Sequence, residues 1–159
     1  MGDIMLAKIA ATPIGDLPLR DPVRVGPDTA LIDVVTALRE RRRGAAIIED
    51  AGGKILGIFT ERDLMLRIEH SSHAWHRQPV KEVMTPDPRP VSVDEPLATA
   101  LRRMKEGSFR RLPVVGKDGT LVGLLSIRDI VRYIAERFPA EFINLPPDPG
   151  HEAHHRWGG

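Results

Sequence analysis

The chain of 159 residues contains no cysteine, and aromatic residues make up only 4% of it. The absence of cysteine excludes disulfides, iron–sulfur clusters and cysteine-ligated zinc, and it fits a reducing compartment. The sequence has no uninterrupted apolar run of the roughly 20 residues that a membrane-spanning helix needs. Its first residues lack a basic stretch followed by an apolar run, so we expect no signal peptide. We therefore expect a soluble, cytoplasmic protein with an aliphatic core.

The chain also lacks a marked excess of charge of one sign. Lysine and arginine together number 23 and aspartate and glutamate 22, which gives a formal net charge of +1. The overall balance therefore gives no reason to expect nucleic acid or an anionic membrane as a partner. The length is sufficient for one compact domain with its own core.

What the chain does contain is an internal repeat. The segment GIFTERD at 57–63 returns as GLLSIRD at 123–129, and Asp63 and Asp129 are separated by 66 residues. The same offset relates Asp21-Pro22 to Asp87-Pro88 without a gap. A fixed period of this size indicates two copies of one supersecondary unit.

Each copy is predicted to run strand, helix, strand, strand, helix. In the first helix the apolar residues Leu31, Val34, Val35 and Leu38 recur at helical spacing, and Asp28 or Thr29 is expected to cap it. Apolar runs separated by glycine-containing turns predict the paired strands. The expected ranges are 23–25, 31–38, 45–48, 55–59 and 60–68 in the first copy, and a helix from Pro96, 112–115, 121–125 and 127–137 in the second.

Neither copy, at about 55 residues, could cover the apolar face of its own small sheet. We therefore predict an α/β (α+β) fold in which two β-α-β-β-α units pack sheet to sheet with approximate two-fold symmetry. The predicted segments are a leader docking as a strand or helix turn (1–13), the first unit (14–70), a linker (71–79), the second unit (80–138) and a Pro/His-rich, largely disordered tail (139–159).

Both copies place a hydroxyl residue three positions before an aspartate, as Thr60 before Asp63 and Ser126 before Asp129. This spacing predicts a capping box at a helix start. The free N–H groups and the dipole of a helix start also favour an anion. An arginine precedes each aspartate, and a carboxylate can accept hydrogen bonds from a ribose diol. Both readings stay open for one copy, but two copies with the Arg-Asp pair favour a phosphorylated ribose.

The duplicated unit, ending in Gly-apolar-apolar-Ser/Thr-x-x-Asp, resembles the CBS domain (cystathionine-β-synthase motif), which occurs in tandem as a Bateman module. The resemblance covers about 14–137, and Phe109–Val115 resembles the family's entry into a strand. It implies a regulatory homodimer that binds AMP, ADP or ATP, or S-adenosylmethionine, between the two repeats and transmits occupancy to a regulated partner protein. Whether Mg²⁺ accompanies a polyphosphate is left open.

Transferred residue by residue, the resemblance implies two clefts. In one cleft, the ribose and phosphate are expected to contact Ser126, Arg128 and Asp129. The adenine is expected to contact residues of the other unit: Thr29, Val34, Gly44 and Ala45. In the other, the corresponding residues are Thr60, Arg62 and Asp63 opposite Ala100, Phe109 and Arg111, with Arg110 and Arg111 reaching phosphates between the clefts. Ala45 leaves room for an adenine ring, whereas Phe109 and Glu95 narrow the second cleft. The Asp129 cleft is therefore expected to be the better occupied.

Three consecutive arginines, Arg41–Arg43, allow another interpretation. They could bind nucleic acid, contact phosphate within the cleft, or form a solvated helix end that suits the helix dipole. The scarcity of aromatic residues for base stacking weakens the first of these.

The six histidines form two groups: His70, His73 and His76, and His151, His154 and His155. Such tracts can bind a divalent metal weakly. We expect solvated histidines and no metal site.

No catalytic constellation is evident. Thr60 and Ser126 have no histidine placed beside them, Asp63 and Asp129 are expected in separate clefts, and no glycine-rich phosphate loop occurs. We therefore expect a protein that is not an enzyme. The alternative is a constitutive dimerisation or adaptor module with clefts that bind no ligand. The Arg-Asp pair present in both copies favours the ligand sensor.

Overall fold

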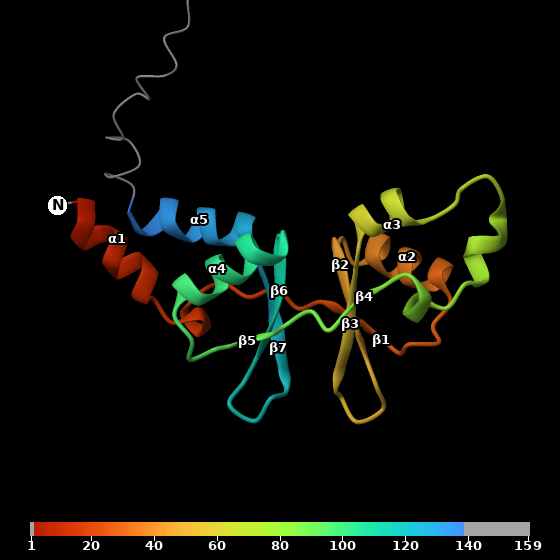
Figure 1. Ribbon diagram of the computed structural model, residues 1–159, viewed down its shortest axis with the longest axis horizontal. Helices are drawn as coiled ribbons and strands as arrows, with labels where there is room; N and C mark the ends of the chain where they lie inside the picture. The colour runs from red at the N-terminus through yellow and green to blue at the C-terminus, as the bar shows by residue number, and fades with distance from the viewer. Residues whose placement is uncertain (1, 139–159) are drawn as a thin grey trace, which may run out of the picture.

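The computed structural model describes residues 2–138 and confirms the predicted α/β (α+β) fold of two units. Figure 1 shows two sheets at the centre, with α1, α4 and α5 beyond one of them and α2 and α3 beyond the other. The elements before the second unit are α1 (Gly2–Ala11), η1 (Ile14–Asp16), β1 (Val23–Val25), α2 (Leu31–Glu40), β2 (Ala45–Glu49), β3 (Ile55–Thr60), α3 (Glu61–Arg67) and η2 (His73–Arg77). Those that follow are η3 (Val80–Glu82), β4 (Thr85–Pro86), β5 (Val91–Ser92), α4 (Leu97–Gly107), β6 (Arg111–Val115), β7 (Leu121–Ser126) and α5 (Ile127–Arg137).

The two sheets repeat the same pairing. The first has the strand order β1-β2-β3-β4 and the second β5-β6-β7. In each, a parallel pair is followed by an antiparallel hairpin, and the registers correspond at the offset of 66. Ala45 lies opposite Thr60 in one hairpin, and Arg111 lies opposite Ser126 in the other. The duplicated hydroxyls therefore occupy equivalent places at the ends of β3 and β7.

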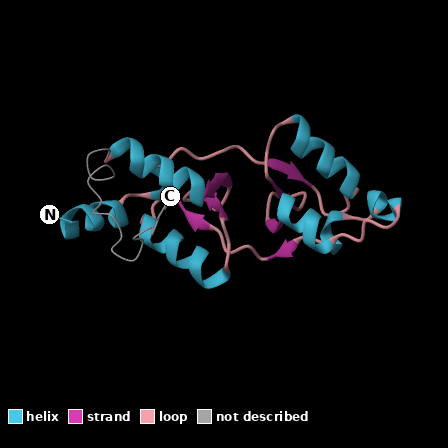
Figure 2. Ribbon diagram, turned by 90° about the horizontal axis from the view of Figure 1, so that it is seen from above, coloured by secondary structure: helices cyan, strands magenta, loops and turns pink. Residues whose placement is uncertain are grey.

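The chain crosses between the halves twice, as Figure 2 shows from above. In the first crossing segment (12–22), Arg20 exchanges two backbone hydrogen bonds with Leu124 of β7, at 3.1 and 2.8 Å. In the second crossing segment (78–90), β4 pairs with β3. Gly123 permits the first contact, because a Cβ there would lie 3.0 Å from the Leu19 Cβ and 3.1 Å from the Arg20 carbonyl oxygen. The first crossing segment thus pairs with β7 of the second sheet, and the second crossing segment pairs with β3 of the first.

Side chains alternate between the two faces of each sheet, as strand geometry requires. On β2, Ala46 and Ile48 face the core under α2, together with Phe59. The residues on the opposite face pack across the seam between the sheets: Ala45, Ile47, Ile58, Leu121 and Leu124. The predicted sheet-to-sheet packing is therefore confirmed by a shared apolar layer.

The predicted cap of α2 is wrong. The helix has Ala30 at its N-cap and no side-chain cap. Instead, the Leu31 N–H donates to the Gln78 carbonyl oxygen (2.8 Å), which belongs to the second crossing segment. Asp28 accepts a hydrogen bond from Lys81 (2.6 Å), which raises the pKa of that lysine. A backbone group of the segment that follows the first unit thus takes the place of the expected side-chain cap.

The leader and the linker are more structured than their composition suggests. The leader forms a helix of ten residues, α1, whose Ile9 is buried in the core of the second unit beside Leu97. The 71–79 segment includes η2, and its Trp75 packs against the first core. The predicted tail at 139–159 lies outside the described residues. Among residues 2–138, no helix has the length and apolar character needed to cross a membrane.

Candidate functional site

A cleft of about 1020 Å³, here called the central cleft, opens where β3 and β7 lead into α3 and α5. It contains both duplicated aspartates, so the two predicted clefts are joined in one continuous cavity with an Asp63 end and an Asp129 end. Eleven of the predicted site residues line it: Gly44, Ala45, Thr60, Arg62, Asp63, Phe109, Arg110, Arg111, Ser126, Arg128 and Asp129.

Three predicted ligand contacts do not line the central cleft. Val34 and Ala100 have no exposed surface and belong to the cores of their own units. They lie on the apolar stripes that hold α2 and α4 against their sheets, and their contact with a ligand stays a prediction. Thr29 lies before α2, where its carbonyl oxygen accepts a hydrogen bond from the Val80 N–H at 2.9 Å.

At the Asp63 end, the predicted capping box is complete. The Thr60 hydroxyl accepts a hydrogen bond from the Asp63 N–H (3.3 Å) and donates one to Asp63 Oδ2 (3.0 Å). The same carboxylate oxygen accepts from the Thr60 N–H at 2.9 Å. Asp63 Oδ1 lies 3.4 Å from Nε of Arg67, one turn along the same helix. The Asp63 side chain remains 14% exposed, and it lines the cleft.

At the Asp129 end, the hydroxyl cap is the same but the counter-charge is different. Ser126 Oγ accepts from the Asp129 N–H (3.1 Å) and donates to Asp129 Oδ2 (2.8 Å). Nε of Arg20 lies 3.1 Å from both carboxylate oxygens. The Asp129 side chain is only 3% exposed, whereas that of Arg20 is 46% exposed. Among the described residues, Asp129 is the one charged residue classed as buried.

Sequence reasoning missed Arg20. It lies outside the repeated motif, and the first crossing segment brings it beside β7. The offset of 66 pairs Arg20 with Pro86. This difference between the copies is the one signal in the sequence that could have drawn attention to it.

The central cleft is rich in positive charge. Its lining includes eight arginines and four carboxylates. Within residues 2–138, six of the arginines make no ion pair: Arg42, Arg43, Arg62, Arg110, Arg111 and Arg128. Because guanidinium groups match the geometry of phosphate oxygens, this lining suits a phosphorylated ligand.

The middle of the cleft brings the units together. A Cβ on Gly44 would lie 2.5 Å from Nη2 of Arg111, so the absence of a side chain leaves room for that guanidinium. Arg42 and Arg43 also line the cleft, while Arg41 pairs with Asp21 at 3.1 Å. Of the alternatives for the arginine triplet, this placement favours phosphate contact within the cleft.

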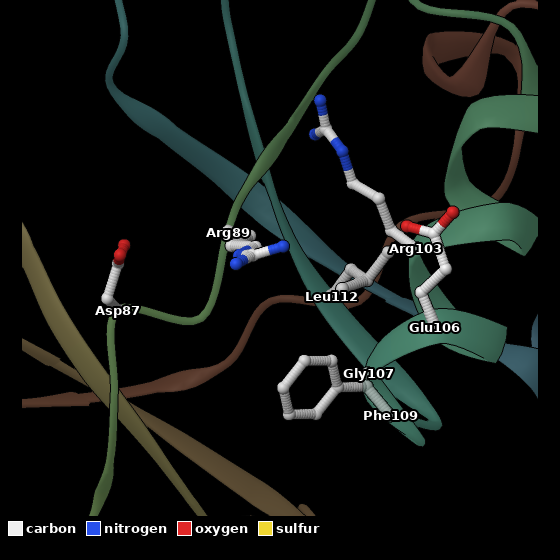
Figure 3. Close-up of a pocket in the computed structure, with 7 residues that line it drawn as sticks. All are labelled: Asp87, Arg89, Arg103, Glu106, Gly107, Phe109 and Leu112. Atoms are coloured by element: carbon white, nitrogen blue, oxygen red, sulfur yellow. The ribbon is translucent and has the colours of Figure 1, made fainter.

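A smaller pocket of about 240 Å³ adjoins the central cleft, with which it shares Gly107 and Phe109. Figure 3 shows Asp87 and Arg89 on the second crossing segment and Phe109 near the end of α4. Glu95, which was expected to narrow this side, lines neither cavity. Its carboxylate instead accepts from the Ser92 N–H (2.7 Å) and pairs with Arg103 (3.2 Å).

The histidines described by the structure surround Trp75 rather than a metal site. The His73 and His76 rings lie 5.0 Å apart, and His76 meets Trp75 edge to face at 4.3 Å. Across the described part of the chain, no three His, Asp or Glu side chains gather as metal ligands. His151, His154 and His155 lie outside the described residues.

Comparison with known proteins identifies the same unit twice. The CBS domain family matches residues 14–70 and 80–136. A CBS-domain-containing protein from Agrobacterium tumefaciens shares 35% identity, with 72% of this chain and 90% of that chain covered and a TM-score of 0.64. CBSX2 of Arabidopsis thaliana in complex with AMP shares 27% identity over 79% of this chain and 97% of that one, with a TM-score of 0.65.

A third similar structure is the cytosolic domain of the Mg²⁺ channel MgtE in complex with ATP. It shares 25% identity, with 82% of this chain and 52% of that chain covered and a TM-score of 0.64. The chain spans only 19% of the length of CBS domain-containing protein CBSCBSPB5 of Arabidopsis thaliana, to which it is 31% identical over 105 residues. With a match in each half and the same paired fold, this chain belongs to the CBS domain family.

Proposed function

We propose that this chain is a regulatory module that binds an adenine nucleotide in the central cleft and transmits its occupancy to a partner protein. The observation that supports this proposal most strongly is that two capped helix starts line a single cavity. The same cavity contains six arginines that make no ion pair within the described residues. The AMP bound to CBSX2 and the ATP bound to the MgtE domain support the ligand class.

Each part of such a ligand has a suitable group in the cleft. Phosphates suit the arginines, and ribose hydroxyls suit a carboxylate that can still accept hydrogen bonds. Phe109 lines the cleft and offers an aromatic face for the base. Because Arg110 and Arg111 line the cleft and can contact additional phosphates, we expect ADP and ATP to bind more tightly than AMP. S-adenosylmethionine, which has no phosphate, is expected to bind most weakly.

The ligand acts through differential binding. It stabilises one arrangement of the two units by no more than the difference between its affinities for the two arrangements. No step of this mechanism requires bond breaking, and we propose that the module is not an enzyme. The arginines supply the positive charge that Mg²⁺ would otherwise bring to a polyphosphate, so binding is expected to persist in the presence of a chelator. The cytoplasmic location stays a prediction.

Thermal unfolding with AMP, ADP, ATP and S-adenosylmethionine tests the proposal. A ligand at a hundred times its Kd adds about 2.7 kcal/mol to the free energy of unfolding, which raises the Tm by roughly 5–10 °C. Asp63→Ala should reduce the shift. Asp118→Ala, which removes a carboxylate from the exposed turn between β6 and β7, serves as the matched control. No shift with any of the four compounds at millimolar concentration would refute the proposal.

A second copy of the chain is the partner that the surface favours most directly. Apolar side chains are exposed on the two helices that begin at the cleft: Met65 (76%) and Leu66 (69%) on α3, and Ile127 (38%) and Val131 (52%) on α5. Burying such side chains drives association. We propose that they form a homodimer interface. Light scattering should give a dimer mass that Met65→Lys lowers to a monomer, while Leu6→Lys on α1 leaves it unchanged. A dimeric Met65→Lys protein would place the interface elsewhere.

The constitutive dimerisation module remains the second candidate function. The same exposed apolar residues support it, and they require no ligand. The two candidates differ in the thermal-shift experiment, since a constitutive dimer would respond to none of the nucleotides.

A further inference from the structure

We infer that Arg20 closes the Asp129 end of the central cleft, so that one nucleotide binds first at the Asp63 end. This inference rests on the proposed function. The internal repeat supplies the comparison that supports it, because two ends of one cavity share a helix start, a capping hydroxyl and an aspartate. They differ in what faces the aspartate, and Arg20 is matched at the offset of 66 by Pro86, which has no charge to offer.

The hydrogen bonds at the Asp129 end leave little capacity for a sugar. Nε of Arg20 lies 3.1 Å from each carboxylate oxygen, and the Ser126 hydroxyl donates to one of them at 2.8 Å. The Arg20 guanidinium carries a full positive charge, so its contact with the carboxylate combines hydrogen bonds with Coulombic attraction. A ribose diol offers neutral donors only. To reach Asp129, whose side chain is 3% exposed, it would have to displace the stronger donor.

At the Asp63 end, Oδ2 accepts hydrogen bonds from the Thr60 N–H and hydroxyl, while Oδ1 has only the more distant Arg67 beside it. Arg67 approaches Asp63 at 3.4 Å, from the same helix, and makes a looser contact than Arg20 makes with Asp129. The Asp63 carboxylate keeps 14% of its surface exposed. The smaller pocket of about 240 Å³ shares Phe109 with the central cleft and provides space beside that ring for a base. A more accessible carboxylate therefore distinguishes the Asp63 end from the Asp129 end.

This arrangement reverses the order of occupancy expected from the sequence, which favoured the Asp129 side because Ala45 is small. Space for the base is of little use where the carboxylate is already paired. Arg20 acts here as a positioning residue: it holds Asp129, and its removal should make a second site available.

Native mass spectrometry with AMP tests the inference on the full chain. We expect the wild type to bind one AMP per chain and Arg20→Ala to bind two, as the freed Asp129 accepts a second ribose. Arg102→Ala, which removes an arginine from an exposed ion pair on α4, is the matched control and should bind one. If Arg20 closes the site, Arg20→Ala should bind one more AMP than the wild type. If Arg20 instead binds phosphate, Arg20→Ala should bind AMP more weakly.

Two further variants keep the test decisive. If Arg20→Ala unfolds, Arg20→Gln removes the charge while retaining most of the side chain. In the wild-type background, Asp63→Ala should weaken AMP binding by about tenfold or more, which is ~1.4 kcal/mol, and by a larger factor than Asp129→Ala does. Equal stoichiometry in the wild type and both Arg20 variants, or a larger loss in Asp129→Ala, would overturn the inference and leave the proposed function intact. Absence of AMP binding in every variant would remove the proposed function and this inference together.

Discussion

The two ends of the central cleft have nearly the same backbone and different electrostatics. Asp63 is balanced by Arg67 on its own helix, and Asp129 by Arg20, 109 residues earlier in the chain. Repetition has thus preserved the helix start and its hydroxyl cap while residues outside the motif set the environment of each carboxylate. Matching motifs in a duplicated protein therefore do not establish equivalent sites.

A second contrast lies at the first residues of β2 and β6. Ala45 and Arg111 are equivalent at the offset of 66, as are Gly44 and Arg110. At these two positions the second unit therefore contributes two guanidinium groups to the lining of the cleft where the first contributes none. Small residues in one unit accommodate long charged residues from the other, as the contact between Gly44 and Arg111 illustrates.

The largest expected effect tests whether the halves are equally important for folding. Phe59 and Leu125 occupy equivalent positions and are both fully buried. We expect Phe59→Ala to lower the free energy of unfolding by about 3–5 kcal/mol and Leu125→Ala by about 2–5 kcal/mol. Because the crossing segments join the sheets, each variant should unfold in one transition in urea. Two separate transitions would show that the halves fold independently.

Arg111→Ala sharpens the comparison across the middle of the cleft. Loss of charge-assisted hydrogen bonds to a phosphate should weaken ATP binding by about 1.5–3 kcal/mol, with a smaller loss for AMP. Titration calorimetry measures both affinities, and Arg102→Ala controls for the loss of one positive charge. Equal losses for AMP and ATP would contradict the placement of the additional phosphates beside Arg111.

The two capping hydroxyls allow a smaller test. Thr60→Ala and Ser126→Ala should each lower the free energy of unfolding by about 1 kcal/mol, since each leaves a helix N–H without its side-chain acceptor. The Ser126 variant is expected to lose slightly more, because its hydroxyl also donates to the buried carboxylate of Asp129. Chemical denaturation of the matched pair gives the difference. A clearly larger loss in the Thr60 variant would reverse this ranking.

The smallest effect is expected for Arg67→Ala. Its ion pair with Asp63 joins residues one turn apart, and the Arg67 side chain is 48% exposed. Such pairs contribute about 0.3–0.5 kcal/mol to the free energy of unfolding. Arg20→Ala, which removes the partner of a buried carboxylate, should destabilise the protein more. Equal changes in the two variants would show that burial of Asp129 has little energetic consequence.

The repeat was sufficient to predict the order of the elements and the hydroxyls that begin α3 and α5, because these depend on local spacing. Contacts across the chain were not predictable in the same way. The cap of α2 depends on the Gln78 carbonyl, and the counter-charge of Asp129 depends on a segment that reaches β7 from the other half. Val34 and Ala100 were assigned as ligand contacts from the family resemblance alone. The resemblance does not reveal that both side chains point into the cores of their units.

The backbone pairing of each crossing segment with the other unit's sheet has a consequence for any attempt to divide the chain. A fragment ending before residue 78 would retain β3 but lose β4, and would expose backbone N–H and C=O groups that invite aggregation. The complementary fragment would lack the segment that meets Leu124. Produced together, the two fragments should recombine, because each carries a backbone segment that pairs with the sheet of the other.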